Sequence, residues 1–180
     1  METLIKKFLD GEISRRVFLF GFIFGFAILL SGCSKNTNSK GQDMTNQTAT
    51  IKTPQGEFSI ELDSQAAPKT VENFVKKSRD GYYKDKVFHR VEDWVVQGGD
   101  PQGDGTGGGD QATELSGRNF AEGAVGVARA GDIKVSNDSQ FFICTKDCSF
   151  LDNQYTYFGK VTSGMDTVKK TQIGDKIESK

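Results

Sequence analysis

The sequence has few of the residues that hold metal ions in proteins. Among its 180 residues it has one histidine, His89, and three cysteines. One histidine together with Cys144 and Cys148 does not supply the four ligands of a structural zinc site. We therefore expect neither a metal ion nor a cofactor, and we interpret His89 as a structural residue of a strand, because buried polar groups are usually satisfied within the fold.

An excess of one charge is also missing, since 23 basic and 24 acidic residues give a formal net charge of −1. Basic runs interleaved with aromatic residues do not occur, so nucleic acid is not an expected partner. The segment Gly103–Gly108 matches G-x-G-x-x-G, but no parallel β-α-β unit surrounds it, and Asp100, Asp104 and Asp110 would repel phosphate. The spacing of these aspartates fits no EF-hand calcium loop either. We interpret the segment as a loop at the edge of a site.

Apolar runs long enough to cross a membrane comfortably are missing as well. Val17–Leu30 has 14 residues, which suits the core of a signal peptide after the basic residues at positions 6, 7, 15 and 16. The run ends in Leu30-Ser31-Gly32-Cys33, which resembles a bacterial lipobox, where the cysteine receives a lipid such as palmitate and becomes the new N-terminus. The sequence therefore predicts a lipoprotein signal peptide over residues 1–32 and lipidation of Cys33, with an uncleaved membrane anchor as the alternative.

Ser14–Leu19 also resembles a twin-arginine export signal, a route that carries folded proteins; an ordinary basic region is the alternative. Residues 33–48 follow, and beyond the cysteine they are mainly Ser, Asn, Thr, Gln and Lys without apolar periodicity. Such a segment cannot bury enough surface to offset the entropy of ordering it, so it is expected to be a flexible linker. The globular domain, residues 49–180, is then held on the extracytoplasmic face of a bacterial cell membrane by the lipid anchor.

Residues 49–180 have the pattern of a β-rich domain with many tight turns. Glu57–Leu62 alternates strictly between polar and apolar residues, as a half-buried strand does, and Thr53–Gly56 before it suits a type I turn. Helices are expected from Pro68 to Gly81 and over Gly164–Gln172. Further strands are expected over residues 50–52, 87–91, 94–97, 123–130, 140–145 and 155–161. Many short strands with two helices predict a β-barrel or a β-sandwich.

The clearest chemical signal lies in Phe88–Pro101, with the sequence FHRVEDWVVQGGDP. It reads as two short strands that meet at Glu92-Asp93 and are followed by a glycine-rich loop. Arg90 stands among apolar neighbours, and Gln97 follows seven positions later. An arginine is not deprotonated in a protein, so Arg90 can donate hydrogen bonds but cannot act as a base.

This stretch resembles the cyclophilin family of peptidyl-prolyl cis-trans isomerases. The resemblance extends to GTGG (Gly105–Gly108), GAVGVARA (Gly123–Ala130), SQFFICT (Ser139–Thr145) and FGKV (Phe158–Val161), which occur in the family's order. It implies a mainly β fold, a closed eight-stranded antiparallel β-barrel capped by two α-helices. It also implies isomerisation of prolyl bonds in proline-containing segments of unfolded or exported proteins, and we expect the chain to be a monomer.

The expected chemistry needs no nucleophile, base or metal. Rotation about a prolyl amide faces a barrier of about 18–20 kcal/mol, because resonance gives the C–N bond double-bond character. An enzyme lowers this barrier by binding the twisted amide better than the planar one. The proline nitrogen accepts a hydrogen bond only when the resonance is broken, so a donor aimed at it is catalytic. Arg90 is the expected donor, and the alternative for Arg90 is a surface ion pair with Glu92 or Asp93.

The resemblance places the substrate-binding residues at positions that match the family's motifs. They supply an apolar slot for the proline ring, an amide that hydrogen-bonds the substrate main chain, and main-chain groups beside the residues before proline. The full set is Trp94, Val95, Gln97, Ala128, Arg129, Gln140, Phe142, Phe150, Leu151 and Tyr155. Ordinary core packing is the alternative for Val95 and Leu151, because apolar residues are usually buried for that reason.

The sequence departs from the family's pattern at several of these positions. The connection after Arg90 is one residue shorter than usual, with Glu92-Asp93 in place of an apolar-Pro-Gly turn. Arg129 stands where asparagine is common, which suggests a preference for acidic residues before proline. Phe150 replaces a tryptophan, and Tyr155 replaces a histidine. The changed turn leaves a second function open, namely a non-catalytic module or chaperone that binds proline segments on the same scaffold.

Two further features stay open in the sequence. Family members have one more long strand after the second helix, and residues 176–180 either begin that strand or the barrel closes differently. Cys144 and Cys148 could pair in an oxidising compartment. We expect two free thiols, because Cys144 faces the core from a strand.

Overall fold

The structure, a computed structural model, describes residues 47–178, so the expected signal peptide and the lipidation site Cys33 lie outside the described residues. This part of the chain is mainly β, as expected. Its elements are nine β-strands, two α-helices and one short 3₁₀ helix. It contains no helix long and apolar enough to cross a bilayer.

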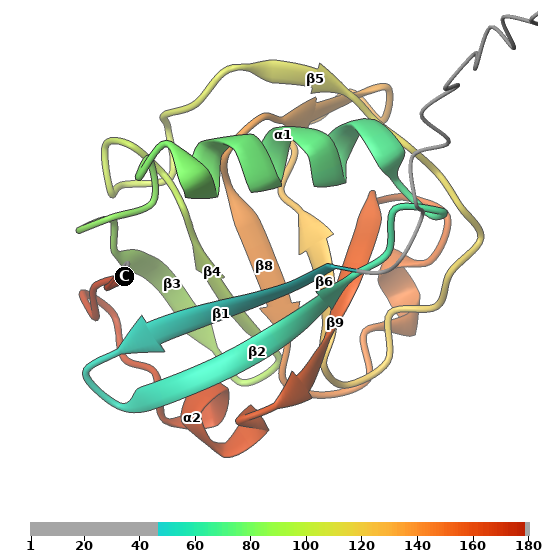
Figure 1. Cartoon of the computed structure of the whole chain (residues 1–180). Helices are drawn as coiled ribbons and strands as arrows, with labels where there is room; N and C mark the ends of the chain where they lie inside the picture. The colour runs from blue at the N-terminus through green and yellow to red at the C-terminus, as the bar shows by residue number, and fades with distance from the viewer. Residues whose placement is uncertain (1–46, 179–180) are drawn as a thin grey trace, which may run out of the picture. The chain divides into compact units, whose positions relative to one another are not determined.

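Seven strands form one antiparallel sheet that curls around the core (Figure 1). Their order in space is β1 (Gln47–Thr53), β2 (Gly56–Leu62), β9 (Tyr157–Ser163), β6 (Ala124–Val127), β8 (Phe141–Cys144), β4 (Val95–Gly98) and β3 (Phe88–Glu92). The expected strands are therefore present. β1 also includes Gln47 and Thr48, which the sequence pattern placed in the linker.

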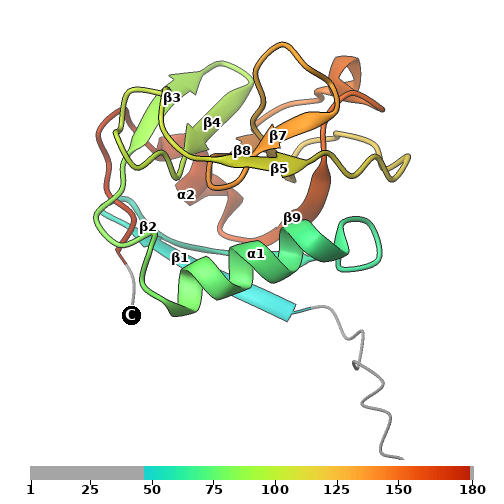
Figure 2. The same ribbon diagram turned by 90° about the horizontal axis from the view of Figure 1, so that it is seen from above.

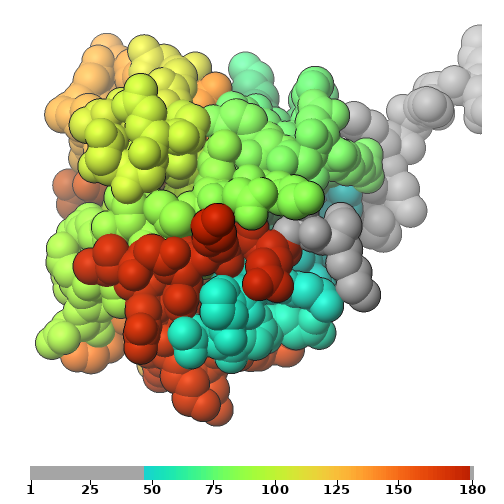
Figure 3. All heavy atoms as spheres, turned by 90° about the vertical axis from the view of Figure 1, so that its left-hand side faces the viewer, coloured from blue at the N-terminus to red at the C-terminus, as the bar shows by residue number. Residues whose placement is uncertain are grey.

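The two edges of this sheet, β1 and β3, do not pair with each other. The C-terminal residues lie between them (Figure 3) and meet the edges at two isolated bridges, Lys52 with Glu178 and Val87 with Lys176. The expectation of a closed eight-stranded barrel therefore overstates the structure, which is a curled seven-stranded sheet with a short segment at the seam. At this seam Gly174 turns the chain with φ of +90°, and isolated bridges rather than a continuous strand ladder join the segment after it to the edges.

The two helices lie over opposite ends of the curled sheet, as expected (Figures 1 and 2). α1 (Pro68–Arg79) begins with proline at its first turn, where the missing N–H costs no hydrogen bond, and it buries Thr70, Val71 and Phe74. α2 (Met165–Lys170) buries Val168. Each helix thus covers the apolar interior with one face.

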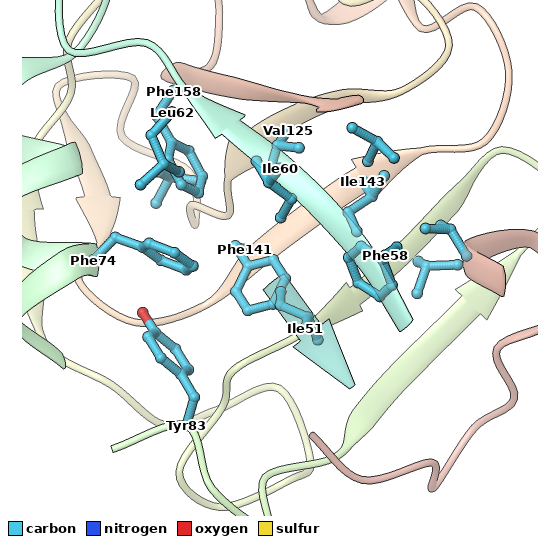
Figure 4. Close-up of a cluster of buried hydrophobic side chains, with 14 of the residues drawn as sticks. Ile51, Phe58, Ile60, Leu62, Phe74, Tyr83, Val125, Phe141, Ile143 and Phe158 are labelled. Atoms are coloured by element: carbon cyan, nitrogen blue, oxygen red, sulfur yellow. The ribbon is translucent and has the colours of Figure 1, made fainter. Parts of the chain in front are cut away.

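The sheet carries an apolar cluster on each face. The inner cluster fills the curl and includes Phe58, Phe74 and Phe141 (Figure 4). The outer cluster is smaller and has seven buried residues, Val95, Phe120, Ala124, Phe142, Cys144, Cys148 and Leu151. Neighbouring residues divide between the two clusters because successive side chains of a strand point to opposite faces. Both Cys144 and Cys148 are free and buried, which confirms the expected thiols.

A second, two-stranded sheet was not expected from the sequence. It pairs β5 (Asp110–Ala112) with β7 (Val135–Asn137). Both strands are three residues long and mostly polar, so neither shows the alternation from which a strand is inferred. This small sheet joins the glycine-rich loop to the segment that follows β6, and it sets the position of one wall of the site.

Candidate active site

A pocket of about 350 Å³ opens on the outer face of the sheet, beside β3, β4 and β8. It brings together nine of the eleven expected site residues. Its lining is His89, Arg90, Trp94, Val95, Gln97, Asp104, Gly105, Ala128, Arg129, Phe142, Leu151 and Tyr155. A pocket of similar volume, about 370 Å³, lies between β1 and α1, but it contains none of the expected residues.

Arg90 comes from β3 and reaches the pocket from a strand whose pairing register shifts between Phe88 and Arg90. Such a bulge re-aims side chains, and adjacent His89 and Arg90 both line the pocket. The Arg90 Nη1 donates to Oε1 of Gln97 at 3.3 Å. Its Nε and Nη2 donate to the two carboxylate oxygens of Glu92 at 2.7 and 3.2 Å. The two interpretations of Arg90 therefore coexist: it lines the pocket and it forms the ion pair.

A chain of amide hydrogen bonds continues inward from Arg90. Gln97 Nε2 donates to Oε1 of Gln140 at 2.9 Å. Gln140 Nε2 then donates to the main-chain oxygens of Gly105 and Gly107 at 3.1 and 2.8 Å. Gln140 is 3% exposed and does not line the pocket. Gln140, expected among the substrate-binding residues, therefore supports Gln97 and the glycine-rich loop from behind the pocket.

Asp100 organises the glycine-rich loop, a role that the sequence pattern did not reveal. Asp100 is 1% exposed, and its carboxylate accepts hydrogen bonds from the N–H groups of Asp104 and Gly105 at 2.8 and 2.7 Å. Burial alone raises the pKa of a carboxyl group, but these and further main-chain N–H donors, including that of Gln102, together lower the pKa of Asp100. The ionised carboxylate therefore holds in place the loop that carries Asp104 and Gly105 to the pocket.

The apolar wall is built on Phe142. Its ring stacks on Phe120 with centroids 5.7 Å apart and meets Tyr155 edge-on at 5.7 Å. Gly126 on the neighbouring strand β6 makes this possible, because a Cβ there would lie 2.5 Å from the Phe142 ring. Leu151 completes the wall from the 3₁₀ helix Ser149–Leu151. This arrangement leaves an apolar slot at the floor of the pocket.

Two aromatic residues extend the wall outward. Trp94 lines the pocket, and its ring meets that of Phe150 edge-on, with centroids 5.1 Å apart. Phe150 does not line the pocket itself and is 56% exposed. A half-buried tryptophan beside an exposed phenylalanine, next to an apolar slot, offers surface to a ligand longer than one residue.

Ala128 and Arg129 border the opposite side, but their main-chain groups differ. The Ala128 N–H donates to Gln140 O at 3.0 Å, whereas within residues 47–178 no hydrogen bond to the Arg129 main chain occurs. The Arg129 guanidinium stacks 4.5 Å from the Tyr155 ring centroid and donates to Gln154 O at 2.9 Å. An extended ligand would therefore meet free main-chain groups at Arg129.

His89 is the remaining polar ring in the pocket. Burial lowers the pKa of His89, and nearby Asp100 and Asp104 only partly oppose this effect. Its Nδ1 is buried without a hydrogen-bond partner among the described residues. The ring is therefore neutral at pH 7. The pocket thus combines two fixed cations, Arg90 and Arg129, with one amide and an apolar slot, and within residues 47–178 no group of three or more His, Cys, Asp or Glu residues could hold a metal ion.

Sequence reasoning missed several residues of this arrangement. Asp104 and Gly105 line the pocket, and Asp100 holds their loop. Glu92 was treated as a competing partner of Arg90, although it also lies beside the pocket. A run of glycines directly after a strand was the available signal for the loop, but hydrogen bonds from a carboxylate to main-chain N–H groups depend on backbone geometry that spacing does not specify.

Comparisons with known proteins agree with this geometry. The family described as "Cyclophilin type peptidyl-prolyl cis-trans isomerase/CLD" matches residues 48–180. Peptidyl-prolyl cis-trans isomerase cypE of Dictyostelium discoideum is 39% identical over 137 residues, which are 71% of this chain and 85% of that protein. A peptidyl-prolyl cis-trans isomerase of Helicobacter pylori is 40% identical over 138 residues, 73% of this chain and 83% of that protein.

A solved structure is similar as well. It is the crystal structure of a cyclophilin-type peptidyl-prolyl cis-trans isomerase of Cryptosporidium parvum in the presence of the dipeptide Ala-Pro. The TM-score is 0.68 at 30% sequence identity, and the match covers 74% of this chain and 96% of that one.

Proposed function

This chain belongs to the cyclophilin-type peptidyl-prolyl cis-trans isomerase family and is a peptidyl-prolyl cis-trans isomerase; we propose that Arg90 is its catalytic residue. The observation that carries the proposal is the place of the guanidinium. It lines a pocket whose far wall is the apolar slot of Phe142 and Leu151. A proline ring in that slot would present its nitrogen toward the cation.

The mechanism is a preference for the twisted amide. In the planar ground state the proline nitrogen shares its lone pair with the carbonyl group and accepts no hydrogen bond. As the bond twists, the lone pair becomes available, and an N–H of Arg90 donates to it. Because this interaction is stronger in the transition state than in either ground state, it raises kcat rather than only binding the substrate.

The other residues hold the substrate in place for this step. Phe142 and Leu151, with Val95 and Trp94, enclose the proline ring. Gln97 hydrogen-bonds the substrate main chain near the reacting bond. The residues before proline run along Arg129, whose guanidinium favours acidic side chains among them. This assignment follows the lining of the pocket and the matching positions of the family's motifs.

The test is exchange of a short proline peptide, measured by NMR line shapes with wild type and with Arg90→Ala. A hydrogen bond from a charged donor contributes about 1.5–3 kcal/mol, so the exchange rate should fall by about one to two powers of ten. Lys146→Ala is the matched control, because its exposed amine pairs with Asp93 at 3.7 Å and lies outside the pocket. This control should keep the wild-type rate.

Two results would contradict the proposal in different ways. Undiminished exchange with folded Arg90→Ala would remove Arg90 from the chemistry. Peptide binding to wild type without accelerated exchange would favour the proline-binding module without catalysis.

We also propose that the enzyme assists the folding of exported proteins from the extracytoplasmic face of a bacterial membrane, anchored by lipid on Cys33 after removal of residues 1–32. The lipobox-like Leu30-Ser31-Gly32-Cys33 supports this location. A Cys33→Ala variant expressed in bacteria should move from the membrane fraction to a soluble or precursor fraction. Equal membrane recovery of variant and wild type would contradict lipidation at this residue.

A further inference from the structure

Glu92 lies where strand geometry must bring it near Arg90. It ends β3, two residues after Arg90, and residues two apart in a strand face the same side of the sheet. The connection to β4 is short, because Glu92 pairs with Val95 in the antiparallel register. The side chains of Glu92 and Arg90 are therefore in contact, and Arg90 in turn lines the pocket.

The contact between them is bidentate. The Arg90 Nε and Nη2 reach the two Glu92 carboxylate oxygens at 2.7 and 3.2 Å. Gln97 Oε1 takes one hydrogen of Nη1. A guanidinium has five N–H donors, so among the described residues one N–H on each terminal nitrogen is left without a protein acceptor. These two donors are the ones that a substrate can use.

The exposed side chain of Arg90 needs contacts that select one rotamer. The Arg90 side chain is 41% exposed, and a long exposed side chain samples many rotamers unless contacts select one. The guanidinium lies 5.1 Å from the Trp94 ring centroid. This contact restrains the plane of the guanidinium but not the rotation of the guanidinium within that plane. The hydrogen bond from Arg90 lowers the pKa of Glu92, with a smaller contribution from Trp94, so Glu92 is ionised at neutral pH.

We propose that Glu92 is a positioning residue of the isomerase, whose carboxylate fixes the guanidinium of Arg90 so that its two remaining terminal N–H groups point to the substrate. The proposal rests on the proposed catalytic role of Arg90. A misplaced catalytic group loses rate even when binding is unchanged. The Glu92-Asp93 turn, which departs from the family's usual turn, thus supplies an acceptor for the catalytic arginine.

The two carboxylates of this turn give a matched pair of variants. Glu92→Gln removes the bidentate acceptor. Asp93→Asn removes a neighbouring carboxylate whose side chain is 95% exposed and whose ion pair is the 3.7 Å contact with Lys146. Both variants change the net charge equally. We expect Glu92→Gln to lower kcat about tenfold, which corresponds to loss of one well-placed donor, with KM within about twofold of wild type. Asp93→Asn should keep both constants.

A double-variant experiment separates this inference from the proposed function. If Glu92 acts through Arg90, then adding Glu92→Gln to Arg90→Ala should lower kcat no further. If Arg90→Ala is fully active, the proposed function fails, and the inference fails with it. If Arg90→Ala is impaired but Glu92→Gln has a normal or raised kcat, only the inference is overturned, and a raised kcat would identify the carboxylate as a competitor of the substrate.

Folding is checked in the same series. Glu92 is exposed at a turn, so the thermal midpoint of Glu92→Gln should equal that of Asp93→Asn. Glu92→Asp is the second variant, because it keeps the charge but shortens the reach by one methylene. An intermediate kcat for Glu92→Asp supports positioning, whereas a kcat equal to that of Asp93→Asn overturns it.

Discussion

The inner and outer faces of β4, β6 and β8 are made from neighbouring residues of the same strands, yet they have different surroundings. Val96, Val125 and Ile143 point inward into the large enclosed cluster. Val95 and Phe142 point outward, where they are also buried but line a pocket open to a ligand. The inner face therefore serves stability alone, whereas the outer face has to stabilise the sheet and bind the substrate.

The two faces also differ in what holds their surroundings in place. The inner cluster is apolar and includes edge-on contacts such as Phe74 with Phe141 at 5.8 Å. The pocket on the outer face is bordered by a loop that depends on the hydrogen bonds its main-chain N–H groups donate to Asp100 and on those that Gln140 donates to its carbonyl groups. Apolar contacts change little with pH, but hydrogen bonds to a carboxylate are lost when it is protonated. The comparison predicts that stability is concentrated inside the sheet and that pH sensitivity is concentrated at the site.

Phe141 and Phe142 test the first part of the comparison, because they are adjacent in β8 and face opposite sides. Phe141 is 2% exposed and contacts Phe74, Tyr83 and Phe88. Phe141→Ala should lower the free energy of unfolding by about 3–5 kcal/mol, the usual cost of a phenylalanine-sized cavity. The measurement is urea unfolding followed by circular dichroism. If Phe141→Ala does not fold, Phe141→Leu provides a smaller loss in the same direction.

Phe142→Ala should lower catalysis more, and stability less, than Phe141→Ala does. It also leaves a cavity, but its ring borders the pocket, so the loss of unfolding free energy should be smaller than for Phe141→Ala. The loss of the apolar slot should lower kcat/KM by about one to two powers of ten, because burying an apolar ring contributes about 1.5–3 kcal/mol. Ile173→Ala, at a side chain that is 69% exposed, is the control and should change neither quantity. Equal loss of stability in both phenylalanine variants would remove the distinction between the faces.

The kind of sequence pattern decided how much of each strand could be predicted from the sequence. Glu57–Leu62 alternates, and the strand lies in the sheet with its apolar residues inside. Phe141–Cys144 is apolar throughout, so its sequence indicated a buried strand but not which side chains face inward. That choice depends on the register between strands, which only the paired structure provides.

The site, like the fold, could be predicted only in part from the sequence. Arg90, Gln97 and Phe142 were identified from motifs in the linear sequence, and all three line the pocket. The supporting contacts of Asp100 were not identified, because they depend on the course of a loop. The ion pair of Arg90 with Glu92 was considered only as an alternative to the catalytic role, because the sequence does not specify side-chain rotamers. The residues that we propose carry the chemistry were thus easier to predict than the residues that hold them in place.

Asp100→Asn tests the second part of the comparison and should have the smallest effect on stability. Hydrogen bonds to a charged group contribute about 1.5–3 kcal/mol. An amide at position 100 has one acceptor oxygen instead of two, so its NH2 group would face either the N–H of Gln102 or the N–H groups of Asp104 and Gly105. We expect a loss of unfolding free energy in this range at pH 7, with a fall in kcat/KM because Asp104 and Gly105 line the pocket. Urea unfolding and peptide exchange measure the two quantities.

The pH dependence of the difference in unfolding free energy between wild type and Asp100→Asn tests the role of the carboxylate more directly. Because folding lowers the pKa of Asp100, its contribution is complete above the pKa of about 3.9 that an unfolded aspartate has, and it is lost as pH falls through the lower pKa of the folded state. The unfolding free energies of wild type and Asp100→Asn should therefore differ by a constant amount from pH 7 to pH 5 and converge below about pH 4. The unfolding free energy of Phe141→Leu should differ from that of wild type by an amount that does not change with pH, because the substitution involves no charge. A difference at Asp100 that persists unchanged at pH 3 would show that packing, rather than the ionised carboxylate, holds the loop beside the pocket.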